Sequence, residues 1–235
     1  MPDFIVLIRE SETSSADLTP LETRALLERQ AAYEQELRAT AAYRDGERLR
    51  PSSEGRRVSL RDGECLVETG PFAEPTLSAY YVLQAPNLDA AVDLVQRGPA
   101  SPGAAFEVRP IMKGRLEPDK TRQPGRVFAF GVLGSAANEQ AWVEVMDRID
   151  ERTQNNFPAE RFRGGVRLDP PSCGQRVSPS GGRRAVFDGP FLETKEVIGG
   201  LFFMRMVTID EAEEWARESA FVKLGMLEIR ELWRS

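Results

Sequence analysis

The sequence predicts an α+β fold made of two tandem ferredoxin-like halves that pack together within one chain. One observation is a repeat at constant spacing, in which Gly46 matches Gly165 and Gly70-Pro71-Phe72 matches Gly189-Pro190-Phe191. A second is that each half follows the order strand, helix, hairpin or strand, strand, helix, strand. Such a half has helices on only one sheet face, and a second copy can cover the other face. We therefore expect an intramolecular dimeric α+β barrel, that is, an internal pseudo-dimer.

The first half begins with an apolar strand at residues 4–8, followed by a helix from about 20 to 42. Thr19 and Pro20 are typical of a helix cap and first turn. The later elements expected in this half are a hairpin at 58–72 turning at Arg61-Asp62-Gly63, a β-rich run at 80–85, a helix from Leu88 capped by Asn87, and a strand at 106–110.

The second half repeats this order after a charged linker rich in Pro and Gly at 113–125. We thus place one module at 1–112 and the other at 126–235. The elements expected in the second module are a strand at 127–132, a helix at 138–155, a hairpin at 175–191 turning at Ser180-Gly181-Gly182, a β-rich run at 201–207, a helix from Ile209 capped by Thr208, and a strand at 227–231.

Composition limits the classes of function. Of the 235 residues, 41% are hydrophobic and 29% are charged, as in ordinary globular proteins. The longest apolar run, residues 198–204, is too short to cross a bilayer. The N-terminus enters an apolar segment without a basic leader, which indicates a first strand rather than a signal peptide. We therefore expect a cytoplasmic protein that does not associate with membranes.

Charge and the absence of histidine exclude further classes. A net charge of −6 argues against sequence-independent nucleic-acid binding. The chain has no histidine, which removes the usual general base at neutral pH and the commonest transition-metal ligand. We expect no metal and no cofactor. An enzyme would need an Asp or Glu base with a strongly shifted pKa, so catalysis ranks below binding.

The segment from Asp188 to Glu196 reads Asp-Gly-Pro-Phe-Leu-Glu-Thr-Lys-Glu and resembles the signature of the DGPF (YCII-related) family. The first half resembles it more loosely, at Thr69-Gly70-Pro71-Phe72-Ala73-Glu74. The resemblance implies a dimeric α+β barrel, a frequent association with extracytoplasmic-function sigma factors, and no settled activity. The wider group has a His-Asp pair proposed as an active site, and this chain lacks the histidine.

The signature segment supports two interpretations. Gly, Pro and Asp are typical of a tight turn at the end of a strand, which needs no ligand. Alternatively, Asp188, Glu193 and Lys195 form a charged cluster at the mouth of a pocket.

Alternation in the last strand places Glu228 and Arg230 on the face opposite Leu227 and Ile229, with Arg205 joining them from a neighbouring strand. These charges form either a paired Glu-Arg network or a polar cavity between the sheets that binds a small polar or anionic molecule. The ligand-binding candidates are Asp188, Glu193, Lys195, Arg205, Glu228 and Arg230.

Arginines also gather around the second hairpin, where Arg183 and Arg184 are adjacent. Solvated loop arginines explain most such clusters. The alternative is a contact surface for an acidic protein partner, with a sigma factor suggested by the family resemblance, and DNA ranks third. Small-molecule binding is thus the first functional hypothesis, and a protein-interaction module is the second.

Overall fold

The computed structural model describes residues 1–13, 18–116, 125–135, 160–180, 183–189, 196–223 and 225–233. The chain divides into two compact units, which are considered separately. Unit 1 comprises Met1–Arg48, Ala73–Ile111 and Pro171–Pro190, whereas unit 2 comprises Leu49–Phe72, Met112–Pro170 and Phe191–Ser235. Each unit therefore combines most of one sequence half with the hairpin of the other half.

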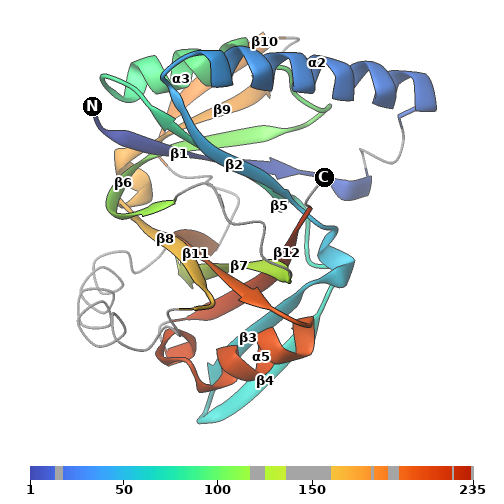
Figure 1. Cartoon of the computed structure of the whole chain (residues 1–235), viewed down its shortest axis with the longest axis vertical. Coiled ribbons are helices and arrows are strands. Elements are labelled where there is room, and N and C mark those ends of the chain that lie inside the picture. Colours follow the sequence, from blue (N-terminus) through green and yellow to red (C-terminus); the bar gives the residue numbers. More distant parts are fainter. Residues whose placement is uncertain are drawn as a thin grey trace. The chain divides into compact units, whose positions relative to one another are not determined.

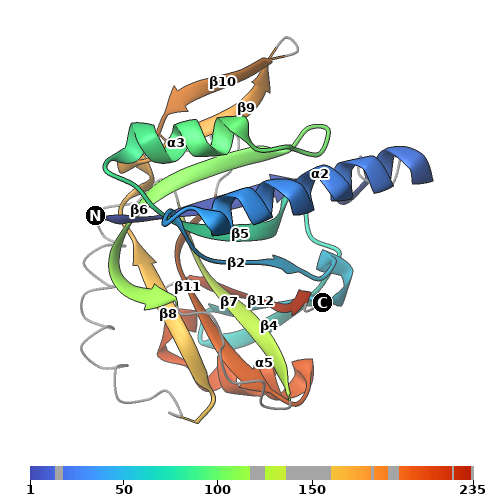
Figure 2. The same ribbon diagram turned by 45° about the horizontal axis from the view of Figure 1, so that its top comes forward.

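Unit 1 contains an antiparallel sheet with helices along one face (Figures 1 and 2). The helices are α2 (Pro20–Ala39) and α3 (Leu88–Arg97). The strands, in spatial order, are β2 (Tyr43–Leu49), β5 (Thr76–Gln84), β1 (Asp3–Glu10), β6 (Ala105–Leu116), β9 (Gln175–Ser180) and β10 (Arg183–Asp188). Alternate residues of β1, namely Phe4, Val6 and Ile8, belong to the core beneath the helices.

The helix starts of unit 1 follow the predicted caps. Thr19 caps α2 in a capping box with Glu22, and Pro20 occupies the first turn. The Asn87 side chain accepts a hydrogen bond of 2.9 Å from the Ala90 amide at the start of α3. These caps satisfy backbone amides that the helices themselves cannot pair.

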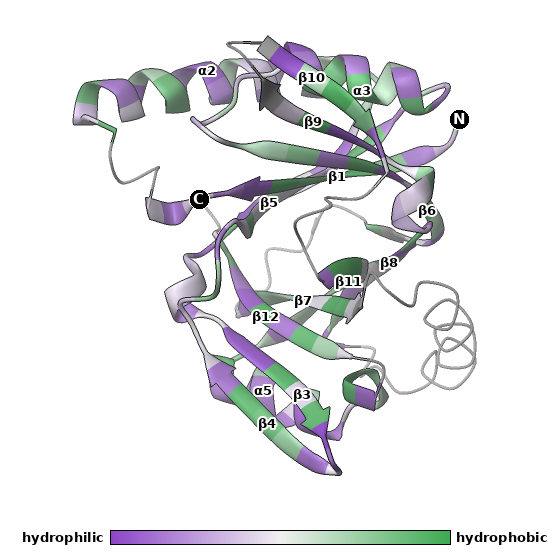
Figure 3. Ribbon diagram, turned by 180° about the vertical axis from the view of Figure 1, so that it is seen from behind, coloured by the Kyte–Doolittle hydropathy of each residue, from purple (hydrophilic) through white to green (hydrophobic). Residues whose placement is uncertain are grey.

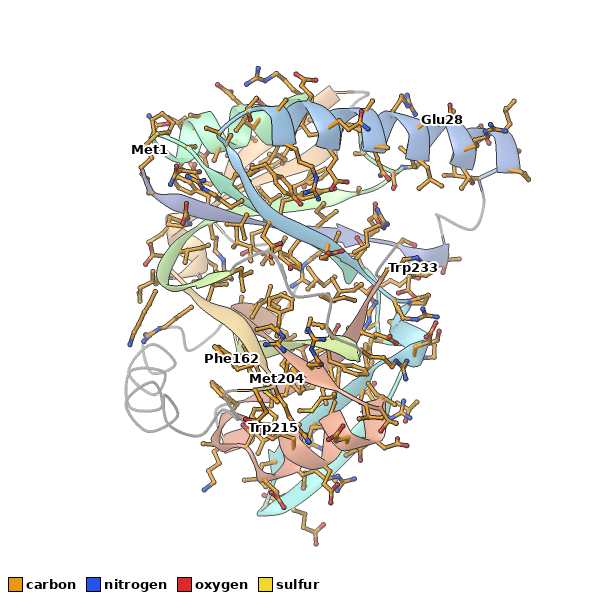
Figure 4. The ribbon with its side chains drawn as sticks, in the orientation of Figure 1. Met1, Glu28, Phe162, Met204, Trp215 and Trp233 are labelled. Carbon is orange, nitrogen blue, oxygen red and sulfur yellow. The ribbon has the colours of Figure 1, made fainter. Side chains whose placement is uncertain are left out.

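Unit 2 contains a second antiparallel sheet. Its strands, in order, are β8 (Phe162–Leu168), β11 (Glu196–Met206), β7 (Arg126–Ser135), β12 (Met226–Trp233), β3 (Arg56–Arg61) and β4 (Glu64–Thr69). Helix α5 (Ile209–Glu218), capped by Thr208 as predicted, packs against this sheet. Phe162, Met204 and Trp215 lie together in this core (Figure 4). Among the described residues, short 3₁₀ helices occur in unit 2 as η1 (Ser52–Glu54) and η4 (Ala220–Lys223), and in unit 1 as η3 (Pro171–Cys173).

The two hairpins are exchanged between the sequence halves. The β3–β4 hairpin comes from the first half and pairs with β12 of the second half, with Val58 opposite Leu227. The β9–β10 hairpin comes from the second half and pairs with β6 of the first half, with Val177 opposite Phe106. Hydropathy varies along β3 and β4, as expected for strands with one buried face (Figure 3).

The predicted α+β class is confirmed, and most predicted elements are present. Strands β2 and β8 were not predicted, and the exchange of hairpins was not foreseen. Helix α2 ends at Ala39, short of the expected position 42. The helix expected at 138–155 and the turn residues Gly181 and Gly182 lie outside the described residues. Within the described ranges, none of the helices has the length and hydropathy needed to span a membrane.

Candidate functional site

A groove opens in unit 1 between the helix-covered face of the sheet and the two helices. Its walls come from β1, β2, β5, β6 and α2, and from the end of α3 with the residues that follow it. The lining residues include Val6, Glu10, Tyr33, Arg48, Tyr81 and Phe106. The cavity volume is about 30 Å³, and the groove continues into open solvent. We call this feature the unit 1 groove.

The polar end of the unit 1 groove is an ion pair. Glu10 ends the inward-facing series of β1, and its Oε2 lies 3.0 Å from Nη2 of Arg48 on β2. The Glu10 side chain is only 7% exposed, whereas that of Arg48 is 44% exposed. A buried carboxylate is stable only with such a partner. The arrangement therefore places a fixed hydrogen-bond acceptor inside the groove and a cation nearer to solvent.

Two tyrosines form part of the wall and remain protonated. Tyr33 on α2 donates a hydrogen bond to the carbonyl of Leu94 on α3, and burial raises the pKa of Tyr33 to about 12. Burial also raises the pKa of Tyr81 on β5. Both phenols are thus neutral at physiological pH, so the described charges of the groove wall are those of Glu10 and Arg48.

The equivalent face of unit 2 is filled by aromatic rings. Strand register shows which residues of the two units are equivalent. Phe4 pairs with Pro110, the residue after Arg109, and Phe128 pairs with Glu231, the residue after Arg230, so Phe4 corresponds to Phe128. Val6, Glu10 and Tyr81 of the groove therefore correspond to Phe130, Gly134 and Phe202. The rings of Phe130 and Phe202 stack with centroids 4.9 Å apart, and Trp215 lies edge-on to both. Among the described residues, the groove's polar end has no carboxylate counterpart in unit 2.

Unit 2 also has a buried charge cluster, on the other face of its sheet. Arg57 of β3 donates to Glu228 Oε2 of β12 over 2.8 Å, and Arg230 Nη1 donates to Glu228 Oε1 over 3.2 Å. Arg230, which is 2% exposed, also donates from Nε to the carbonyl oxygen of Arg50 over 3.0 Å. We call Arg57, Glu228 and Arg230 the Glu228 cluster. Its charges are paired within the protein.

The repeated glycines and the Gly-Pro-Phe segment pack around the Glu228 cluster. A Cβ on Gly55 would lie 2.6 Å from Cδ of Arg230 and 3.0 Å from the ring of Phe72. The Phe72 amide donates to Ser52 Oγ over 3.3 Å, and the Arg57 guanidinium lies 4.3 Å from the Phe72 ring centroid. In the first copy, the signature residues therefore support a buried Glu-Arg pair.

Unit 1 contains the matching arrangement from the other copies of these segments. Arg109 is fully buried, and its Nε lies 3.0 Å from Oε1 of Glu107. A Cβ on Gly174 would lie 2.5 Å from Cγ of Arg109. The Gly189 amide donates to the Gly174 carbonyl over 3.0 Å, as the Gly70 amide donates to the Gly55 carbonyl over 3.3 Å. The same backbone contact thus occurs in both copies.

The structure places the predicted ligand-binding residues in different environments. Glu228 and Arg230 are together in the Glu228 cluster, and strand register puts partly buried Arg205 on the same sheet face. Asp188 is exposed in unit 1, where its Oδ1 accepts a hydrogen bond of 3.1 Å from Gln175. Glu193 and Lys195 lie outside the described residues. Ligand binding by these residues stays a prediction.

Of the predicted interaction-surface residues, Arg184 contacts its own unit. Its Nη1 donates to the carbonyls of Val95 and Gln96 at the end of α3, over 2.9 and 3.1 Å. Its guanidinium also lies 5.3 Å from the ring centroid of Phe106. The Arg183 side chain lies outside the described part of the structure. A role for either residue in binding a partner stays a prediction.

Sequence reasoning missed Glu10 and Arg48 as site residues. One signal was present, because Glu10 continues the inward-facing series of Phe4, Val6 and Ile8 and is the one charged residue of that series. Arg48 lies in the unpredicted strand β2, so its direction could not be inferred. Their proximity depends on the pairing of β2 with β5, and of β5 with β1.

Comparison with known proteins adds a family. The model of the YCII-related domain matches residues 4–115 and again residues 122–235. An uncharacterised protein of Rhizobium meliloti (strain 1021) is 37% identical over 100 residues, which is 42% of this chain and 81% of that protein. A crystal structure provisionally assigned as a chlorite dismutase aligns over 100% of this chain and 96% of its own, at 11% identity and a TM-score of 0.39, too weak a likeness to carry an argument. The two family matches together cover nearly the whole sequence, and the chain therefore belongs to the YCII-related domain family, with two copies of the domain in tandem.

Proposed function

We propose that this protein binds a small molecule in the unit 1 groove. The observation that carries the proposal is the buried carboxylate of Glu10 at one end of a largely apolar groove, paired with the more exposed Arg48. Small-molecule sites combine apolar walls with a few fixed polar groups. The Glu228 cluster is a weaker candidate, because its charges are paired with one another and with backbone.

The size of the groove determines how a ligand enters. The cavity volume of about 30 Å³ is well below the usual range for small-molecule sites. That volume is room for only about two water molecules. A bound molecule therefore extends to the open side of the groove or displaces the wall formed by Tyr33 and the residues after α3.

The proposal extends to the fold. The strand order in each unit is compatible with a ferredoxin-like core that is extended by one exchanged hairpin. This arrangement favours an internal pseudo-dimer of the dimeric α+β barrel type. A small polar or anionic ligand bound by Arg205, Glu228 and Arg230 stays a prediction from the sequence. The interaction module linked to a sigma factor likewise stays a prediction, made from the family resemblance.

The proposal can be tested by titrating toluene, an uncharged apolar probe, into isotopically labelled protein while recording amide NMR spectra. We expect saturable shifts concentrated on groove residues such as Ile8 and Tyr81. Ala100→Leu adds bulk at the groove wall and should reduce these shifts. Ala31→Leu makes the same change at an exposed position of α2 and should leave them intact. Shifts that are scattered, or that survive Ala100→Leu unchanged, would remove the support for this site.

A further inference from the structure

The Glu10–Arg48 pair presents both an acceptor and donors to the groove. The contact between them joins one guanidinium nitrogen, Nη2, to one carboxylate oxygen, Oε2. Among the described residues, the second carboxylate oxygen of Glu10 and the Nε and Nη1 groups of Arg48 make no further hydrogen bond. A carboxylate has about four acceptor positions and a guanidinium has five N–H donors, so both groups can bind more.

The pair is neutral overall, and this restricts what can bind beside it. A ligand carboxylate would bring a second negative charge next to the buried Glu10, and a ligand ammonium would bring a second positive charge next to Arg48. Each would leave an unbalanced charge in a partly desolvated site. An uncharged group with a donor next to an acceptor can instead donate to Glu10 and accept from Arg48, leaving the ion pair intact.

Resting on the proposed function, we infer that the ligand is a largely apolar, uncharged molecule whose head group carries an adjacent hydrogen-bond donor and acceptor, as a primary amide does. When the head group binds Glu10, the apolar part of the ligand faces Ile8 and Val6, which follow on the same side of β1. Val6 is four residues from Glu10, or about 13 Å in an extended strand. Phe106, opposite Ile8 on the neighbouring strand, continues the apolar wall. Polarity thus decreases along the groove from Glu10 towards Val6.

Three probes that share one ring can test this inference: benzamide, benzoate and benzylamine. In the wild-type protein at neutral pH, benzamide should bind about tenfold or more tightly than either charged probe, the effect of one charge-assisted hydrogen bond. Glu10→Gln leaves Arg48 without its carboxylate, so the preference should move to benzoate. Arg48→Gln leaves the Glu10 carboxylate alone, so the preference should move to benzylamine. If the pair has a purely structural role, each of these substitutions should instead weaken the binding of all three probes to the same extent.

The matched controls are Glu28→Gln and Arg24→Gln, which change an exposed ion pair on α2 and should leave the order of the three probes unchanged. The order in the wild-type protein decides the matter even if a variant does not fold. Tightest binding of benzoate or benzylamine to the wild type, or equal binding of all three, would overturn the inference while leaving a toluene-binding groove in place. Absence of binding by toluene and by all three probes would overturn the proposed function as well.

Discussion

At the level of single residues, the molecule buries several arginines, and each needs an acceptor. Arg230 and Arg109 are among the largest fully buried side chains. Leaving one such charge unpaired would cost several kcal/mol, by order of magnitude. The neighbouring glutamates and backbone carbonyls satisfy this requirement, and Gly55 and Gly174 leave room for the aliphatic part of each arginine.

A side chain at Gly55 or Gly174 should therefore destabilise the protein. Gly174→Ala places a Cβ 2.5 Å from Cγ of Arg109 and 2.7 Å from the Val108 carbonyl, and Gly55→Ala meets Cδ of Arg230 at 2.6 Å. Neither neighbour is the free end of a flexible chain. We expect each substitution to lower the free energy of unfolding by about 1–3 kcal/mol, measured by urea denaturation.

Gly131→Ala provides the control for this prediction. Gly131 lies in β7, and a Cβ there would meet its nearest atom at 3.6 Å, an ordinary van der Waals distance. It should change stability by much less than Gly174→Ala. An equal loss of stability in all three variants would show that replacing any of these glycines is destabilising. The contacts with the arginines would then not be the cause.

Part of the Glu228 cluster could be predicted at the residue level, whereas Glu10 and Arg48 of the unit 1 groove were not. Alternation correctly put Glu228 and Arg230 on the face opposite Leu227 and Ile229, since strand geometry alone determines this. Arg57 could not be predicted as the partner of Glu228, because it reaches β12 only through pairing between strands far apart in sequence. A local pattern gives direction along a strand, whereas long-range pairing decides which charges meet.

At the level of secondary-structure elements, the exchanged hairpins distinguish this fold from two independent halves. Their strands were predicted, and so was the turn of the first hairpin, where Asp62 and Gly63 adopt positive φ values of 53° and 84°, as hairpin turns require. Their partners were not, because a hairpin pattern does not indicate which sheet edge it joins. Strand β2 escaped prediction for a different reason. Its sequence, Tyr-Arg-Asp-Gly-Glu-Arg-Leu, is mostly polar and contains a glycine.

The hairpin from the second half should contribute measurably to unit 1 through Arg184. This side chain donates to two carbonyls at the C-terminal end of α3, where a cation also interacts favourably with the helix dipole. Burial lowers the pKa of Arg184, so part of the free energy gained from these hydrogen bonds offsets the cost of removing the charge from water. Arg184→Met should lower the free energy of unfolding by about 1 kcal/mol in thermal or urea denaturation.

Arg97→Met is the matched control, because Arg97 lies on α3 itself and donates a hydrogen bond to the Asp93 carbonyl of the same helix. Its replacement should change stability by less than about 0.5 kcal/mol. Equal effects of the two substitutions would mean that the β9–β10 hairpin adds no stability to α3 through this contact.

At the level of the whole molecule, the two units differ in the chemistry of their cores. All four tyrosines of the chain, Tyr33, Tyr43, Tyr80 and Tyr81, belong to unit 1. The corresponding core of unit 2 uses Phe130, Phe202 and Trp215. The repeat predicted the same architecture for both halves, but the residues that form the two cores differ. Unit 1 alone therefore has a core that can ionise at alkaline pH through phenols.

Alkaline pH should therefore destabilise unit 1. Burial is the largest cause that raises the pKa of each tyrosine, to about 12 for Tyr33 and well above 10 for Tyr80, whose hydroxyl donates to Asp45. A phenol with a raised pKa in the folded state contributes stability that is complete below its unfolded pKa near 10 and is lost as pH rises through its folded pKa. A fully buried phenol such as Tyr80 should thus cost up to about 1.4 kcal/mol of stability per pH unit between pH 10 and its folded pKa, and the partly exposed Tyr33 should cost less. Between pH 10 and pH 12, the near-ultraviolet absorbance of tyrosinate should be lower in the folded protein than in the urea-unfolded chain. Tyr80→Phe should reduce the decrease in the free energy of unfolding over this pH range. Normal titration of all four phenols near pH 10 in the folded protein would show that this core is open to solvent.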